Sequence, residues 1–96
     1  MKTIQLNNKE YPIKIDMGVL EDFEEEAGSP ALEINLKSIK QIRILLGLAL
    51  KAGGNDDYVK VANDGMNADL TGVITKVMDY YLKVVMPEAE GIDTGK

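Results

Sequence analysis

The chain has 96 residues, of which 45% are hydrophobic and 28% are charged, and its formal net charge is -5. This size predicts one domain with one core, and no apolar run approaches the roughly 20 residues that cross a bilayer. The acidic excess argues against nonspecific nucleic-acid binding, and the lack of His and Cys removes the usual zinc ligands and the commonest general base.

Residues 3–15 are predicted to form a β-hairpin. Apolar and polar residues alternate over residues 3–6 and 11–15, which is the period of strands with one buried face. The intervening Asn7, Asn8 and Lys9 suit a turn, because Asn tolerates positive φ. Pro12 lacks a backbone donor and is expected on a free edge or at a bulge. A lone hairpin is marginal in water, so this one must lie on a helix or pair with another chain.

A first helix is predicted over residues 17–27, with Asp16 as its N-cap and Gly28 as the left-handed residue after its end. Its acidic run, residues 21–26, is interpreted mainly as a solvated face, with a contact to a basic partner as the alternative. The spacing of apolar residues over 31–36 leaves open a short strand or an apolar loop that plugs the core.

The central helix is predicted over residues 39–52, and we expect the other elements to pack around it. Ser38 and Gln41 have the spacing of a capping box, and Gly53 with Gly54 is expected to supply a left-handed stop. Most of this helix is apolar around its circumference, which is typical of burial on several sides. Its polar positions form one narrow stripe: Lys40, Arg43, Gly47 and Lys51.

Two further helices are expected, one over about residues 56–64 that ends at Asp64 and Gly65, and one over about residues 69–86. The residues between them resemble a calcium loop only faintly, and a turn between helices explains them better. Asn67 or Asp69 is expected to open the last helix. Pro87 ends it, and residues 87–96 have the composition of a flexible tail. The prediction is a predominantly helical α+β domain over residues 1–86, a hairpin packed on about four helices.

Candidate partner-binding residues fall into two groups. The first is an apolar and aromatic cluster near the end of the last helix, where such residues are typical of interfaces but could equally cover the hairpin or the first helix. The second is the basic stripe, which suits a solvated edge, pairing with the acidic helix, or complementarity between subunits of a homo-oligomer. The residues chosen are Tyr80, Tyr81, Val84 and Met86 in the first group, and Lys40 and Arg43 in the second.

No convergent catalytic, cofactor-binding or metal-binding set is visible in the sequence, so we do not expect an enzyme or a cofactor. The N-terminal stretch lacks the apolar core of a signal peptide, which predicts a cytosolic protein without a membrane association.

The order of these elements resembles the tail assembly chaperones of long-tailed bacteriophages. In that family a short hairpin with an Asn/Gly-Lys-x-Tyr turn precedes a helix that contains Leu-Glu and ends at Gly. The corresponding stretches here are residues 8–11, Leu20-Glu21 and Gly28, and the resemblance is clearest over residues 3–54. No binding residue transfers from these structural motifs.

The resemblance implies a non-enzymatic protein of the bacterial cytoplasm that binds the phage tape-measure protein and assists assembly of the tail-tube protein. Such a chaperone leaves the finished tail and is not expected in the mature virion. The alternative is a small acidic inhibitor or DNA mimic from a phage or mobile element. That class requires carboxylates over one continuous face, whereas here they concentrate in residues 21–26.

Overall fold

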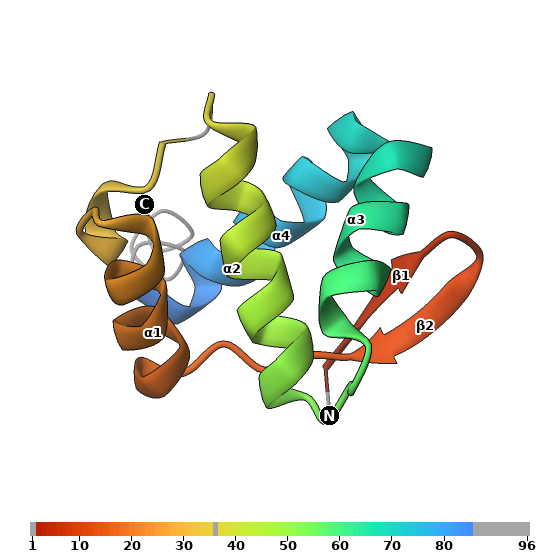
Figure 1. The fold of residues 1–96 in the computed structure, drawn as a ribbon, viewed down its shortest axis with the longest axis horizontal. Coiled ribbons are helices and arrows are strands. Elements are labelled where there is room, and N and C mark those ends of the chain that lie inside the picture. Colours follow the sequence, from red (N-terminus) through yellow and green to blue (C-terminus); the bar gives the residue numbers. More distant parts are fainter. Residues whose placement is uncertain (1, 36, 86–96) are drawn as a thin grey trace, which may run out of the picture.

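A computed structural model describes residues 2–35 and 37–85 of the chain. It confirms the predicted α+β, mostly helical fold, in which a two-stranded antiparallel hairpin precedes four α-helices (Figure 1). The predicted tail, residues 87–96, lies outside the described residues. The elements in chain order are β1 (Thr3–Leu6), β2 (Lys9–Pro12), α1 (Met17–Ala27), the 3₁₀ turn η1 (Ala31–Glu33), α2 (Ile39–Ala52), α3 (Tyr58–Ala68) and α4 (Leu70–Val85).

The expected turn and second strand are corrected: the turn has two residues and excludes Lys9, because Leu6 pairs with Lys9 across the strands, and β2 covers Lys9–Pro12 rather than residues 11–15. Asn7 and Asn8 have φ values of 54° and 69°, as in the type I′ turn whose twist matches that of the flanking strands. The register pairs Thr3 with Pro12, and the next backbone bond is donated by the Ile13 amide to the Lys2 carbonyl at 2.9 Å. Hydrogen-bonded and open pairs alternate in such a ladder, so the Pro12 nitrogen faces away from β1, as expected.

The residues predicted to cap the two ends of α1, Asp16 and Gly28, do so in the structure. Asp16 Oδ1 accepts a hydrogen bond from the Val19 amide at 3.0 Å, and this bond lowers the pKa of the Asp16 carboxyl. Gly28 has a φ of 70°, and its amide donates to the Glu24 carbonyl. Residues 31–36 were expected to form either a short strand or an apolar loop, and within residues 31–35 the structure has the 3₁₀ turn η1 instead of a strand. The Glu24 carboxylate accepts a hydrogen bond from the Ala31 amide at 2.8 Å.

Helix α2 lies in the middle of the molecule and packs against α1, α3 and α4 (Figure 1). Its predicted capping box forms only in part. The Gln41 amide donates to Ser38 Oγ at 3.2 Å, whereas Gln41 Oε1 accepts from the Asn35 amide at 2.7 Å instead of returning to Ser38. The side chain of Gln41 therefore ties the preceding loop to the helix.

The predicted role of Gly53 as a left-handed stop is wrong, because its φ is -79°. Gly54 supplies that conformation, with a φ of 99°. Gly53 is needed for a different reason: a Cβ there would lie 2.6 Å from the Pro12 carbonyl carbon and 2.9 Å from Ile13 Cα. The end of α2 thus packs backbone to backbone on the end of β2.

The predicted end of the third helix is also wrong. Helix α3 begins at Tyr58 and continues through Gly65 to Ala68. Gly65 provides room for β1, since a Cβ there would lie 3.0–3.3 Å from three side-chain atoms of Leu6. Asp69 forms the junction to α4: its amide donates to the Gly65 carbonyl, and its Oδ1 accepts from the Gly72 amide at 3.1 Å.

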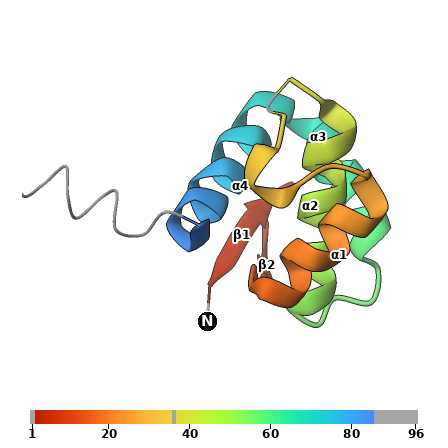
Figure 2. The same cartoon turned by 90° about the vertical axis from the view of Figure 1, so that its left-hand side faces the viewer.

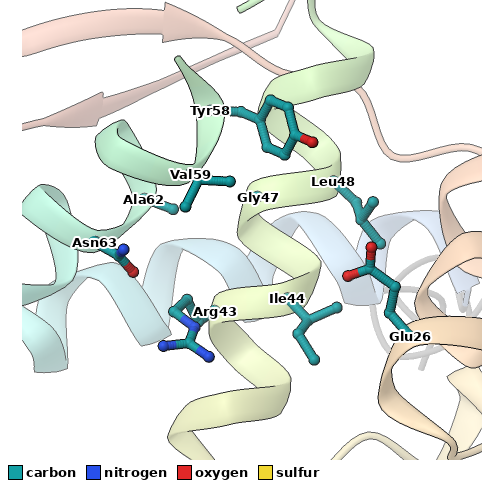
Figure 3. A pocket seen from close by; sticks show the side chains of 9 residues that line it. All are labelled: Glu26, Arg43, Ile44, Gly47, Leu48, Tyr58, Val59, Ala62 and Asn63. Atoms are coloured by element: carbon teal, nitrogen blue, oxygen red, sulfur yellow. The ribbon is translucent and has the colours of Figure 1, made fainter. Parts of the chain in front are cut away.

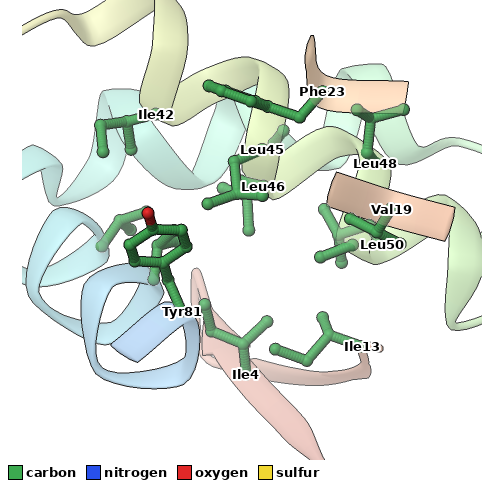
Figure 4. Packing of buried hydrophobic residues seen from close by; sticks show 14 of the residues in the cluster. Ile4, Ile13, Val19, Phe23, Ile42, Leu45, Leu46, Leu48, Leu50 and Tyr81 are labelled. Carbon is green, nitrogen blue, oxygen red and sulfur yellow. The ribbon is translucent and has the colours of Figure 1, made fainter. Parts of the chain in front are cut away.

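The core gathers side chains from every part of the fold around α2 (Figure 4). Ile4 and Leu6 enter from β1, Phe23 enters from α1, and Tyr81 enters from α4. Ile4 and Leu6 of the hairpin are 2% and 1% exposed. The hairpin is therefore covered by helices of its own chain, which was expected as the alternative to pairing with another chain.

Candidate protein-binding groove

Helix α4 divides its side chains between the core and the hairpin. Its buried residues are Val73, Val77 and Tyr81. A second row, spaced by four residues, consists of Lys76, Tyr80 and Val84, and two of its members bind β1. Lys76 Nζ donates to the Gln5 carbonyl at 3.0 Å, and the Tyr80 hydroxyl donates to the Thr3 carbonyl. Figure 2 shows α4 running beside β1.

An open groove of about 430 Å³ begins where this second row leaves β1. It lies between the end of α4, the end of α2, and the chain that follows β2. Its walls are mainly apolar, and lysines contribute at two positions. The lining residues are Lys2, Ile13, Lys14, Ile15, Ala52, Gly53, Tyr80 and Val84.

The basic residues of the groove have local partners that hold them near it. Lys2 Nζ lies 5.6 Å from the centroid of the Tyr80 ring, a cation–π contact. Lys14 Nζ lies 3.4 Å from Asp16 Oδ2. Both contacts are at the surface, where a cation–π contact contributes about 0.5–1 kcal/mol and an ion pair about 0–1 kcal/mol. Both ammonium groups therefore remain available to a partner carboxylate.

The structure brings Tyr80 and Val84 together, but it places Tyr81 elsewhere. Tyr81 is only 4% exposed, and its hydroxyl donates to the Ala31 carbonyl. Burial raises the pKa of Tyr81, and a hydrogen bond from the Ile34 backbone opposes this effect. Tyr81 is therefore a core residue, and the expectation that it contacts a partner is corrected. Met86 lies outside the described residues.

The basic pair on α2 is not part of this groove. Lys40 and Arg43 are exposed, and Arg43 lines a second groove of about 330 Å³ between α2, α3 and the end of α1. Figure 3 shows Arg43 and Glu26 on either side of Ile44. Among residues 2–35 and 37–85, the ion pairs join Lys14 to Asp16, Lys60 to Asp64, and Lys83 to Asp79, so none joins α1 to α2.

Sequence reasoning missed most of the groove lining. The strand-like alternation identified Ile13 and Ile15 as apolar positions, but it did not place them beside α4. The sequence pattern at Gly53 indicated only the end of a helix. Nothing in the sequence marked Lys2 or Ala52, because each lines the groove only through contacts between distant segments.

The described part of the chain holds no cluster of three or more acidic side chains placed to bind a metal ion. Within the same residues, no helix has the length and apolar character needed to cross a membrane. Comparisons of the chain with protein-family models, with curated proteins and with solved structures returned no match. A functional proposal therefore depends on the family resemblance and on the groove.

Proposed function

We propose that this chain is a non-enzymatic tail assembly chaperone of a long-tailed bacteriophage or prophage, which binds the tape-measure protein and assists tail-tube assembly. The resemblance over residues 3–54 supports the family. The observation that carries the binding role is the apolar groove in which Tyr80 and Val84 face Ile13 and Ile15. Aromatic and aliphatic side chains that gather in a concave site are typical of binding sites.

The groove and the charge of the chain have complementary roles in this proposal. Apolar side chains in the groove cover an apolar stripe on the tape-measure protein, which would otherwise aggregate. The net charge of -5 keeps the resulting complex soluble through repulsion between copies. The acidic residues of α1 are exposed and lie outside the groove.

The chaperone acts in the cytoplasm of the bacterial host and leaves before the virion is complete. Lys40 and Arg43 on α2 are exposed and are available for contacts between neighbouring copies, whose carboxylates on α1 have the opposite charge.

The proposal is tested by co-expressing the chain with the tape-measure protein encoded beside it. We expect the tape-measure protein to move from the insoluble to the soluble fraction, and a tagged copy of the chain to retain it. The mass of the purified complex, measured by light scattering, gives the number of copies bound.

A matched pair of variants makes this experiment specific. Val84→Asp places a carboxylate in the groove, whereas Leu82→Asp places one on the same helix end outside its lining. The two side chains are 37% and 42% exposed, so neither change buries a charge in the core.

An insoluble tape-measure protein with no retained complex would contradict the proposal. Retention of a basic or nucleic-acid-processing protein in its place would favour the inhibitor alternative.

A further inference from the structure

The carbonyls of β1 beside the groove are hydrogen-bonded to α4. Tyr80 and Lys76 donate to the carbonyls of Thr3 and Gln5, which lie on the outer edge of the strand. A peptide that binds by strand addition needs such carbonyls for its own amides. It would have to displace both α4 side chains, so this edge is closed to strand addition.

The chain after β2 is occupied in the same way. The Pro12 carbonyl accepts from Asn55 Nδ2 at 2.8 Å, and Pro12 itself has no amide hydrogen. The Lys14 amide donates to the Ala49 carbonyl at 3.1 Å. The backbone on this side of the groove is thus committed to α2 and to the loop that follows it. A partner in the groove therefore meets side chains rather than a free strand edge.

The side chains of the groove favour a particular partner surface. Ile13, Ile15 and Val84 present aliphatic groups, and Tyr80 presents a ring held by its hydrogen bond to β1. Lys2 and Lys14 line the same groove, where Lys2 Nζ lies over the Tyr80 ring and Lys14 Nζ lies 3.4 Å from Asp16 Oδ2. Aliphatic walls with polar residues beside them are the usual receptor for the apolar face of an amphipathic helix, and the two lysines select carboxylates next to that face.

We propose that the groove binds one face of an amphipathic helix in which Asp or Glu side chains flank the apolar stripe. This inference rests on the proposed function and narrows it, because it identifies the kind of tape-measure segment that is bound. A helix with Lys or Arg in the flanking positions is bound more weakly, since its charges meet those of Lys2 and Lys14.

Synthetic peptides test the inference directly. The first probe is a labelled helical peptide of 18 residues with a Leu and Ile stripe flanked by Glu, and the second carries Lys at every Glu position. A third has the same composition as the first, rearranged to alternate like a strand. Fluorescence anisotropy with the full chain should show the acidic helix binding at least about tenfold more tightly than either other peptide.

Two sets of variants locate the binding. Val84→Asp should weaken the acidic helix by about tenfold or more, whereas Leu82→Asp should change its affinity by less than about twofold. The double variant Lys2→Glu, Lys14→Glu should remove the preference for acidic over basic flanks. Equal loss in Val84→Asp and Leu82→Asp, or an unchanged preference in the double variant, would overturn the inference. Circular dichroism of each variant verifies that the helices are intact.

Other occupants of the groove give distinct results. A peptide of residues 86–96 that displaces the acidic helix at equal concentration would assign the groove to the chain's own C-terminal segment. Dimerisation in sedimentation experiments that Val84→Asp abolishes would assign it to a second copy. Either result overturns the inference.

The inference and the proposed function fail in different ways. If the tape-measure protein is retained equally by Val84→Asp and by Leu82→Asp, the groove is not its binding site, although the chaperone function stands. If the acidic helix binds the groove but the tape-measure protein is not retained, the groove is a helix receptor and the chaperone function is wrong.

Discussion

Replacing Gly53 by Ala should destabilise the domain strongly, although Gly53 lies at a helix end with an ordinary right-handed conformation. A Cβ at this position would lie 2.6 Å from the Pro12 carbonyl carbon, whereas unstrained carbon atoms approach to about 3.5–4.0 Å. The end of α2 must therefore move away from β2 by roughly 1 Å. Both contacting atoms belong to the backbone, so no side-chain rotation relieves the overlap.

The free-energy cost of Gly53→Ala follows from the hydrogen bonds that join the end of β2 to α2 and the loop after it. The hydrogen bonds from Asn55 Nδ2 to the Pro12 carbonyl and from the Lys14 amide to the Ala49 carbonyl measure 2.8 Å and 3.1 Å. Their loss costs about 0.5–1.5 kcal/mol each, and overpacking typically adds about 1–3 kcal/mol. Alanine reduces the entropy of the unfolded chain and returns about 0.4–1 kcal/mol. These contributions give a net loss of about 1–5.6 kcal/mol, and a loss of about 3 kcal/mol, near the middle of that range, would lower Tm by roughly 12–24 °C for a domain of this size.

Urea denaturation followed by circular dichroism measures this change, and Gly47→Ala is its control. A Cβ at Gly47, in the middle of α2, would lie at an ordinary 3.7 Å from Tyr58 Cδ2. That substitution should therefore stabilise the domain by about 0.5–1 kcal/mol through helix propensity. A Gly53→Ala variant within about 0.5 kcal/mol of the parent chain would refute the close-approach argument.

Three other predictions follow from the structure. Tyr81→Phe should cost about 1–2 kcal/mol by leaving the Ala31 carbonyl unpaired. The pKa of Tyr81 is raised in the folded chain. Its contribution to the free energy of unfolding is therefore complete below about pH 10 and declines at higher pH. Urea denaturation of the Tyr81→Phe variant at several pH values should lack this decline. Asp16→Ala should cost about 1 kcal/mol at neutral pH through loss of the N-cap bond. The folded pKa of Asp16 is lowered, so this difference should shrink as pH falls through that pKa, and a constant difference would contradict the assignment. Self-association through Lys40, Arg43 and the acidic face of α1 should weaken as salt rises, and sedimentation that is insensitive to salt would count against it.

Because Tyr81 is buried, the Tyr81→Asp substitution tests folding rather than partner binding. Tyr81→Asp would place a carboxylate where 4% of the side chain is exposed, so it should unfold the domain rather than separate binding from folding. Val84→Asp is the appropriate probe of binding, because its position lies in the groove wall and is partly exposed. Helical circular dichroism that survives in the Tyr81→Asp variant would show that the core tolerates the charge.

The candidate groove illustrates why a site of this kind is only partly visible in a sequence. The clustering of aromatic and aliphatic residues near the end of α4 singled out Tyr80 and Val84, which line the groove, and their contact with a partner stays a prediction. It did not separate them from Tyr81, because neighbouring residues on a helix point in directions about 100° apart. Which direction is buried depends on where α2 and the segment around Ala31 lie, and the Ala31 carbonyl that accepts from Tyr81 is 50 residues earlier in the chain.

Features that arise from neighbouring residues could be predicted from the sequence. The two Asn residues of the hairpin turn, the Asp16 cap and the left-handed Gly28 each satisfy a backbone requirement within a few positions. The amphipathic period of α4 likewise indicated a long helix with one buried face.

The roles of Gly53 and Gly65 depend on how distant segments of the chain pack. Both have the local appearance of helix stops, yet Gly53 lies against Pro12, and Gly65 lies inside α3 against Leu6. The reason is that glycine serves both for its backbone freedom and for its lack of a side chain. A glycine needed for its backbone freedom depends on adjacent residues and can be predicted from the sequence. A glycine needed for its lack of a side chain depends on what approaches from a distant segment, and that is fixed only when the hairpin packs on the helices.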